Sequence, residues 1–309
     1  MTKFVILTLL IALVIGALWL WRQPGPQQLD LADRLYPLGA RFDGSVKRGI
    51  IYSEQSGQRL DIYQPAGQGA HRVVLFFHGG SWRDGSRAGY GFVGRAFAAQ
   101  GFTTIVADYR KAPQHKFPDF VADAAAAADW AHNNIAQYGG DASRIFLMGH
   151  SAGAHIAMLA ALDPQWLAAH GSDSAIITGV IGISGPYDFL PFEPGGPADA
   201  VMGDWPSPQE TQPITYARRG APPVLLLTGD ADTTVRPRNS INLHRAMEDA
   251  GAICAVKAYA GLNHIDPIMA ISRPFRAKAP VIDDASAFIR TAPESVAAQQ
   301  PGRENPAQK

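Results

Sequence analysis

One serine bracketed by glycines constrains the fold of this chain more than any other feature. Residues 149–153 read Gly-His-Ser-Ala-Gly, after a mainly apolar run at 144–148 and before a helix-forming segment at 154–162. This order predicts a strand, a tight turn and a helix, with glycines where the turn leaves no room for side chains. The turn would expose the hydroxyl of Ser151 as a nucleophile. It would also place the N–H of Ala152 at a helix start, where negative charge is stabilised.

A pair of glycines earlier in the chain adds to this picture. The apolar run at 72–77, of strand length, ends in His-Gly-Gly-Ser-Trp at 78–82. Because Gly79 and Gly80 lack side chains, the backbone N–H groups there can approach a bound group closely. For this motif in isolation, an ordinary glycine turn with a packing tryptophan is the alternative. Together with Ala152, the pair predicts an oxyanion hole.

A serine hydroxyl becomes a strong nucleophile only when a base removes its proton and a carboxylate orients that base. Two candidate acids, Asp230 and Asp232, follow one apolar run. His264 is the candidate base, because it follows the last expected strand and precedes the closing helix. The histidines of the two glycine turns are more simply structural. The sequence has no metal-ligand spacing and no phosphate-binding glycine loop with a lysine, so neither a metal nor a cofactor is expected.

The alternation of elements predicts the fold class. It favours a mostly parallel, doubly wound α/β sheet, in which sites lie beyond the carboxyl ends of the strands. The domain is expected over 45–292, opening with a hairpin. Strands are expected at 49–53, 60–63, 72–77, 102–107, 144–148, 176–183, 223–227 and 253–259, and helices at 117–137, 154–162, 238–250 and 280–290.

A long segment at 184–220, rich in proline and glycine, interrupts this alternation. Loops of this length inside a domain are usually functional. The segment is therefore expected to cover the serine and to shape a pocket, although a surface excursion without substrate contact is the alternative. Its candidate apolar walls are Tyr187, Phe189, Phe192 and Trp205.

The ends of the chain differ from this domain. Phe4 to Trp21 is uncharged and apolar, long enough to cross a hydrocarbon core of about 30 Å. Residues 1–22 are therefore predicted to be an uncleaved signal anchor, a single membrane helix with the catalytic domain extracytoplasmic, which is periplasmic in a bacterium. A cleaved export signal is the alternative. Residues 23–44, with three prolines, predict a linker, and residues 293–309 predict a polar tail.

The composition limits which kinds of binding partner are expected. The 309 residues contain 27 basic and 27 acidic side chains, so the formal net charge is zero. This balance gives no reason to expect nucleic acid or another polyanion. The single cysteine, Cys254, cannot form an internal disulfide. The membrane, through the N-terminal helix, and a small uncharged substrate are the expected partners.

At these motifs the chain resembles the carboxylesterase branch of the α/β-hydrolase family, and within it prenylcysteine methylesterase-like and kynurenine formamidase-like members. The resemblance spans about residues 49–290 and includes Asp-Tyr-Arg-Lys-Ala-Pro at 108–113 and Gly-x-x-Asp-x-x-Val at 229–235. It implies the α/β-hydrolase fold and a triad of Ser151, Asp232 and His264. Asp232 is preferred to Asp230 because it is the fourth residue of the second pattern.

The resemblance implies a serine hydrolase that cleaves carboxylic esters of small molecules through an acyl-enzyme. Short-chain or aryl esters are expected, because aromatic residues in the covering segment favour an apolar pocket. Two alternatives stay open. A formamidase or amidase would use the same catalytic residues, and a non-catalytic membrane-tethered interaction module would use none of them.

Overall fold

Eight strands form one sheet in the computed structural model, which describes residues 25–37 and 42–292. Their order across the sheet is β1-β2-β4-β3-β5-β6-β7-β8. Strand β2 runs antiparallel to both of its neighbours, and the remaining neighbours are parallel. The strands are β1 (Ser45–Ser53), β2 (Gln58–Gln64), β3 (His71–Phe77), β4 (Thr103–Ala107), β5 (Gly140–His150), β6 (Ile177–Ile183), β7 (Val224–Gly229) and β8 (Cys254–Tyr259).

The central strands are mainly apolar because helices cover both faces of the sheet. Every residue of β4, β6 and β7 is buried. A strand that is buried on both sides lacks the usual alternation of polar and apolar residues. The parallel register aligns the strand ends, with Phe77 of β3 beside Gly149 of β5 and Gly149 beside Gly182 of β6. The turns that follow these strands therefore meet at one edge.

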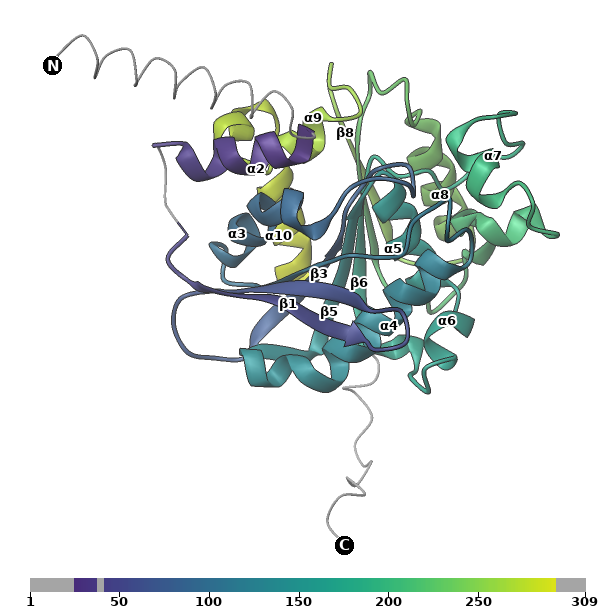
Figure 1. Ribbon diagram of the computed structural model, residues 1–309. Helices are drawn as coiled ribbons and strands as arrows, with labels where there is room; N and C mark the ends of the chain where they lie inside the picture. Colours follow the sequence, from purple (N-terminus) through teal and green to yellow (C-terminus); the bar gives the residue numbers. More distant parts are fainter. Residues whose placement is uncertain (1–24, 38–41, 293–309) are drawn as a thin grey trace, which may run out of the picture.

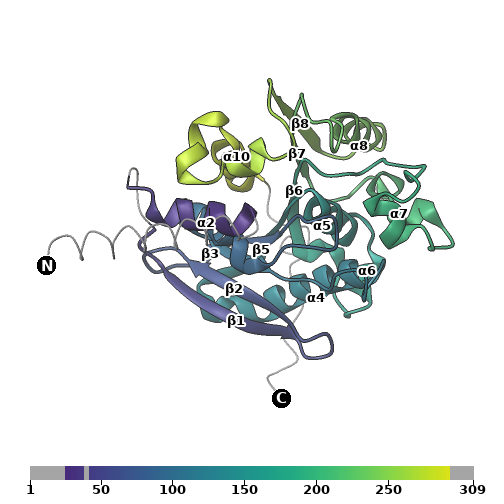
Figure 2. The same ribbon diagram turned by 45° about the horizontal axis from the view of Figure 1, so that its top comes forward.

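Two layers of helices lie against the two faces (Figures 1 and 2). One layer contains α4 (Asp119–Asn134), α5 (Ala152–Leu162), α6 (Gln165–Ala168) and α8 (Arg238–Asp249). The other contains α2 (Gly25–Leu35), α3 (Gly91–Ala98) and α10 (Val281–Thr291). Every residue of α5 is buried, since this helix lies between the sheet and neighbouring helices. The strands and long helices predicted for the domain are confirmed.

The linker predicted over 23–44 is wrong for Gly25–Leu35, which form helix α2. Pro26 lies in the first turn of this helix, where a missing N–H costs no hydrogen bond. Asp30 and Asp33 face inward and pair with Arg95 of α3 at 2.9 and 2.6 Å. These ion pairs attach the segment to the domain, so it is part of the globule.

The covering segment at 184–220 is a succession of short helices. It contains α7 (Pro197–Met202), η4 (Pro208–Thr211) and η5 (Pro213–Tyr216). Each of the three has a proline in its first turn, which sets the backbone for a helix start. The segment contacts α5 and α8 and lies over the edge of the sheet where the site turns meet (Figure 1).

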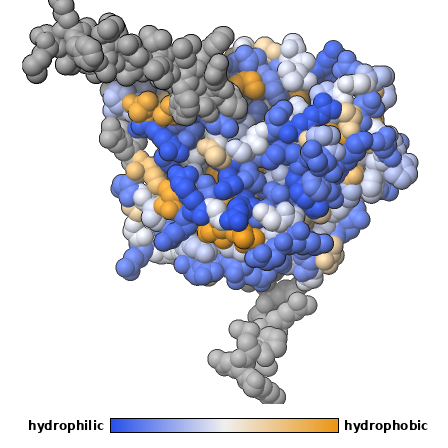
Figure 3. Space-filling view, viewed as in Figure 1, coloured by the Kyte–Doolittle hydropathy of each residue, from blue (hydrophilic) through white to orange (hydrophobic). Residues whose placement is uncertain are grey.

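The predicted signal anchor at 1–22 and the predicted tail at 293–309 lie outside the described residues. Among the helices of residues 25–37 and 42–292, none has both the length and the apolarity to cross a membrane. The face drawn in Figure 3 is mainly hydrophilic, with apolar side chains in small separate patches.

Candidate active site

Ser151 lies on the turn between β5 and α5, with backbone angles φ 54° and ψ −122°. This left-handed φ is rare for a residue with a side chain and is strained. The flanking glycines make the turn sterically feasible. A Cβ on Gly149 would lie 2.2 Å from the carbonyl oxygen of Gly153, and a Cβ on Gly153 would lie 2.1 Å from that of Phe77.

The structure brings Ser151, His264 and Asp232 into one chain of hydrogen bonds. Ser151 Oγ lies 2.9 Å from Nε2 of His264, and Nδ1 of the same ring lies 2.8 Å from Oδ2 of Asp232. The carboxylate accepts a hydrogen bond from Nδ1–H, which fixes the tautomer in which Nε2 is unprotonated and can take the serine proton. The side chain of Asp232 is fully buried and that of His264 is 12% exposed. This arrangement can remove a proton from the serine hydroxyl.

The two candidate aspartates have different partners. Oδ1 of Asp232 accepts hydrogen bonds from the N–H groups of Thr234 and Val235 at 2.9 and 2.8 Å, and Oδ2 faces His264. Asp230 instead accepts from the N–H of Gly261 at 2.6 Å, on the exposed side of the same loop. Asp232 can therefore orient His264, whereas Asp230 joins two loops.

The predicted oxyanion residues lie on both sides of Ser151. A Cβ on Gly79 would be 3.3 Å from Cβ of Ser151, so the first glycine of the pair packs directly against the serine. Gly80 has φ 128°, and its carbonyl accepts hydrogen bonds that close a tight turn. Ala152 is the first residue of α5, and N–H groups at a helix start have no acceptor within the helix. Backbone donors from these two turns are thus available beside the serine.

A polar cluster around His78 and Asp108 supports the glycine pair. The buried ring of His78 stacks on Tyr109 at 4.4 Å between ring centroids, and Tyr109 Oη donates to the His78 carbonyl at 2.9 Å. Asp108 accepts from the N–H of Arg87 at 2.7 Å and pairs with its guanidinium. Burial acts to raise the pKa of Asp108, but His78 and Arg87 outweigh it and lower that pKa to about 2. The ionised Asp108 therefore connects Arg87 to His78, the residue before the glycine pair.

Burial keeps two further histidines neutral. His150 lies beside His264, with 5.1 Å between ring centroids, and burial together with the His264 charge lowers the pKa of His150 to about 3. His155 accepts from Trp82 Nε1 at 3.2 Å and donates through Nε2 to the carbonyl of Thr211 at 2.8 Å. Burial lowers the pKa of His155 to about 4. A neutral His155 therefore joins the glycine loop to the covering segment.

The loop that carries His264 has its own brace, which sequence reasoning missed. Asp266 accepts from the N–H of Asn263 at 3.0 Å, and Asn263 Oδ1 accepts from the N–H of Ile265 at 2.9 Å. The hydrogen bond from Lys278 and then that from Asn263 lower the pKa of Asp266. Asn and Asp commonly form such local turns, and their spacing around His264 is the sequence signal.

A cavity of about 410 Å³ opens above Ser151. Phe189 and Phe192 line it, as predicted, and Trp82 adds an apolar wall. The prediction is wrong for the other two aromatic residues. Tyr187 is fully buried against Gly182 and Gly185, and Trp205 packs on Phe117 with 4.9 Å between ring centroids. Charged groups at the cavity wall come from Glu193, Arg236 and Arg238.

The described residues contain no group of three histidine, cysteine or acidic side chains that could hold a metal ion. The sheet order, the strand–serine–helix turn and the Ser–His–Asp hydrogen bonds together define an α/β hydrolase. The family model BD-FAE matches residues 60–247, so the chain belongs to the BD-FAE family.

Named relatives and solved structures agree with this placement. Isoprenylcysteine alpha-carbonyl methylesterase of Arabidopsis thaliana is 31% identical over 73% of this chain and 58% of its own length. Esterase LipC of Mycobacterium tuberculosis is 33% identical over 61% of this chain and 52% of its own length. The chain thus spans little more than half of these relatives.

Among solved structures, esterase 2 of Thermogutta terrifontis is similar to this chain at 25% identity. Its propionate-bound form has a TM-score of 0.67 and covers 80% of this chain and 93% of its own. Its form phosphonylated by sarin also has a TM-score of 0.67 and covers 82% of this chain and 96% of its own.

The buried neutral His155 predicts a specific dependence of stability on pH. Its pKa falls from 6.5 to about 4 on folding, so the stability it contributes is present above pH 6.5 and is lost as pH falls toward 4. In His155→Gln the slope of unfolding free energy against pH in this window should fall by about 1.4 kcal/mol per pH unit, the value for one proton. Urea unfolding at a series of pH values measures this slope. Parallel curves for the two proteins would contradict the prediction.

Proposed function

We propose that the chain is a serine esterase in which Ser151 is the nucleophile, His264 the general base and acid, and Asp232 the orienting carboxylate. The observation that carries the proposal is the hydrogen-bonded path from Ser151 Oγ through the His264 ring to Asp232, at 2.9 and 2.8 Å. The names of the relatives, which are esterases or methylesterases, support the same reaction class.

Acylation begins when Nε2 of His264 takes the proton of the Ser151 hydroxyl as Oγ attacks the ester carbonyl carbon. The carbonyl π electrons move onto oxygen, and N–H groups of Gly79, Gly80 and Ala152 are the proposed donors to that oxyanion. When the tetrahedral intermediate collapses, the bond to the alkoxy oxygen breaks. The His264 imidazolium then donates its proton to the leaving alcohol, and the acyl group stays on Ser151.

Deacylation repeats these steps with water. His264 removes a proton from the water as its oxygen attacks the acyl carbon, and a second oxyanion forms. Its collapse breaks the bond to Ser151 Oγ, which recovers its proton from His264. The product is a carboxylic acid, and the enzyme returns to its starting protonation state.

The proposed substrates are esters with a short or aryl group. The cavity of about 410 Å³ is lined by Trp82, Phe189 and Phe192, so binding gains from removing apolar surface from water, at about 25 cal/mol per Å². Esterase 2 of Thermogutta terrifontis, a similar protein, has a structure with bound propionate, a three-carbon acid.

Substituting the two neighbouring aspartates tests the assignment of the acid. Asp232→Asn should lower kcat by about 10⁴-fold, because an amide cannot hold His264 in the required tautomer. The matched control Asp230→Asn should stay within a few-fold of wild type, since the Asp230 carboxylate accepts from the N–H of Gly261 while His264 pairs with Asp232. Steady-state hydrolysis of p-nitrophenyl acetate gives both values. Equal losses in the two variants, or the reverse order, would reject this assignment.

A panel of substrates tests the proposed specificity. We expect p-nitrophenyl acetate and butyrate to have higher kcat/KM than the palmitate, because a long chain exceeds the cavity. Their kcat/KM should also be higher than that of an ester with a free carboxylate and that of an N-formyl aromatic amine. If the formamide has the highest kcat/KM, the enzyme is a formamidase that uses the same three residues. If the ester with a free carboxylate has the highest kcat/KM, the cavity selects anionic substrates through Arg236 and Arg238, which line it.

We also propose that residues 1–22 anchor the enzyme in a membrane with its catalytic domain extracytoplasmic. The uncharged run from Phe4 to Trp21 supports this location. The full-length protein should stay in the membrane fraction after a high-salt wash, because apolar insertion is insensitive to ionic strength. Protease added after permeabilising only the outer barrier should digest the domain. Soluble protein trimmed at its N-terminus would show that the segment is a cleaved signal.

A further inference from the structure

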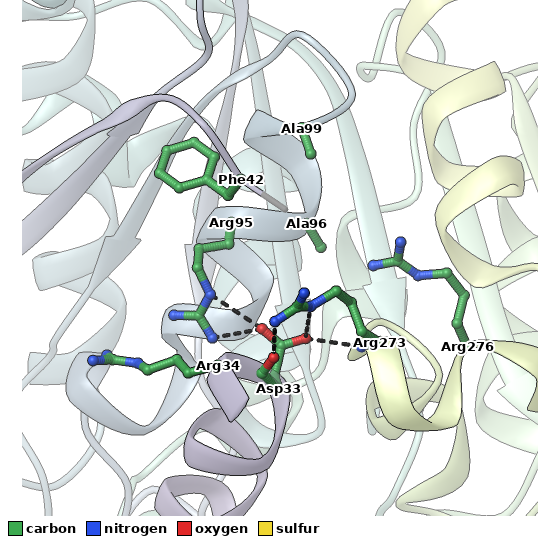
Figure 4. Close-up of a pocket in the computed structure, with 8 residues that line it drawn as sticks. All are labelled: Asp33, Arg34, Phe42, Arg95, Ala96, Ala99, Arg273 and Arg276. Carbon is green, nitrogen blue, oxygen red and sulfur yellow. Dashed lines mark hydrogen bonds and ion pairs between the residues drawn. The ribbon is translucent and has the colours of Figure 1, made fainter. Parts of the chain in front are cut away.

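A second cavity, of about 170 Å³, lies at the junction of α2, α3 and the short helix η6 (Arg273–Lys278). It is separate from the cavity above Ser151 and shares no lining residue with it. Four of its eight lining residues are arginines, from three different elements, and the remaining walls are mostly small or apolar (Figure 4). The lining residues are Asp33, Arg34, Phe42, Arg95, Ala96, Ala99, Arg273 and Arg276.

The carboxylates near this cavity do not balance its arginines. Asp30 pairs with Arg34 at 2.8 Å and with Arg95 at 2.9 Å. Asp33 pairs with the Arg95 guanidinium at 2.6 Å. It also accepts from the backbone N–H of Arg273 at 2.8 Å and lies 3.6 Å from Nε of the same residue. Two carboxylates thus face four guanidinium groups. The cavity is electropositive even with these ion pairs formed.

Arg273 shares the Asp33 carboxylate with Arg95, and Arg276 has no ion-pair partner among the described residues. Nη1 of Arg273 is buried and has no hydrogen-bond partner among the described residues. In Figure 4 the Arg276 side chain extends toward that of Arg273, and no dashed line joins Arg276 to a carboxylate. Its Nη2 donates to the carbonyl of Ile271 at 3.1 Å, which is a neutral acceptor, and no carboxylate of residues 25–37 or 42–292 forms an ion pair with it. A buried donor without a hydrogen-bond partner costs free energy, which a bound anion would offset at Arg273. Arg276 is exposed, so its charge is open to solvent and to a bound anion.

The surroundings of Arg276 also disfavour its positive charge. Burial, opposed by Asp33 and reinforced by the nearby charge of Arg273, lowers the pKa of Arg276. The other acid that acts on it, Asp283, is exposed on α10 and is not within ion-pair distance among the described contacts. An anion between the two arginines would relieve their mutual repulsion.

We propose that this arginine cavity binds a phosphate group. Arginines that line the cavity from α2, α3 and η6 suit a tetrahedral anion, whose oxygens point in several directions, and arginine pairs with phosphate through two parallel hydrogen bonds. Two sources present this chemistry, a free or small-molecule phosphate and a phospholipid headgroup. The second is relevant because the predicted membrane segment precedes α2 by only a few residues, and headgroups lie at the membrane surface.

Arg276→Gln tests the cavity with the least disturbance, because the variant breaks no ion pair of the described residues. Calorimetric titration of the full-length protein in neutral detergent, with inorganic phosphate against chloride at matched ionic strength, measures binding. Wild type should bind phosphate, and Arg276→Gln should bind it at least about tenfold more weakly, the loss of one charge-assisted contact. Arg245→Gln, the same change at an exposed arginine on α8, should bind as wild type does. Ester hydrolysis should be unchanged in both variants.

A second variant and a competition experiment with lipid micelles complete the test. If Arg276→Gln fails to fold, Arg34→Gln removes a different cavity arginine and should weaken phosphate binding likewise. Micelles containing a diether phosphatidylglycerol, which has no ester bond to cleave, should compete with phosphate if a headgroup is the ligand. Lack of competition would assign the site to a free or small-molecule phosphate. A wild-type titration with phosphate that matches chloride, or an Arg276→Gln variant with wild-type affinity, would overturn the proposal.

Discussion

The close approach of α5 to the end of β3 is the constraint on which the rest of the site depends. Gly153 sits against the carbonyl oxygens of Phe77 and His78, at distances that exclude a Cβ. This contact fixes where α5 begins and therefore where Ser151 stands, in a backbone conformation that few side chains adopt. Because the strands are parallel and in register, the loops that carry Gly79, Asp232 and His264 leave the same edge of the sheet. The steric contact places Ser151 beside the glycine pair, and the strand register brings the two remaining loops to the same edge.

Around this turn, hydrogen bonds outweigh burial and lower the pKa of Asp108, and burial lowers the pKa of His150 and His155. Asp232 and Asp108 are carboxylates that accept several hydrogen bonds, whereas burial keeps His150 and His155 neutral. His264 differs because its ring is partly exposed and lies between a carboxylate and a hydroxyl. A neutral His150 adds no positive charge beside it. This placement fits the proposed role of His264 as the general base and acid.

The sequence predicts the domain well wherever a local pattern has one physical cause. Continuous apolar runs indicate strands covered on both faces, and Gly-His-Ser-Ala-Gly indicates a turn without space for side chains. Predictions are incomplete where the cause is tertiary. Helix α3 has no clear sequence signal because it contains glycines, and Gly94 is required since a Cβ there would lie 2.2 Å from the Tyr63 ring. The sequence predicts a linker in place of helix α2 because prolines lie at 24, 26 and 37, and a local pattern does not show that Asp33 pairs with Arg95, 62 residues away. Likewise, aromatic residues of the covering segment could be recognised as apolar, but which of them face the cavity depends on packing against Gly182 and Phe117.

The central claim is that Ser151 is a nucleophile activated by the fold, and covalent trapping tests it most directly. The folded full-length protein is treated with a fluorophosphonate, which reacts with activated serines, and the modified residue is identified by peptide mass spectrometry. We predict a single stoichiometric adduct on Ser151, which disappears when the protein is unfolded before treatment and is absent from Ser151→Ala. A folded protein that carries no adduct at Ser151, or that is labelled equally after unfolding, would contradict the claim.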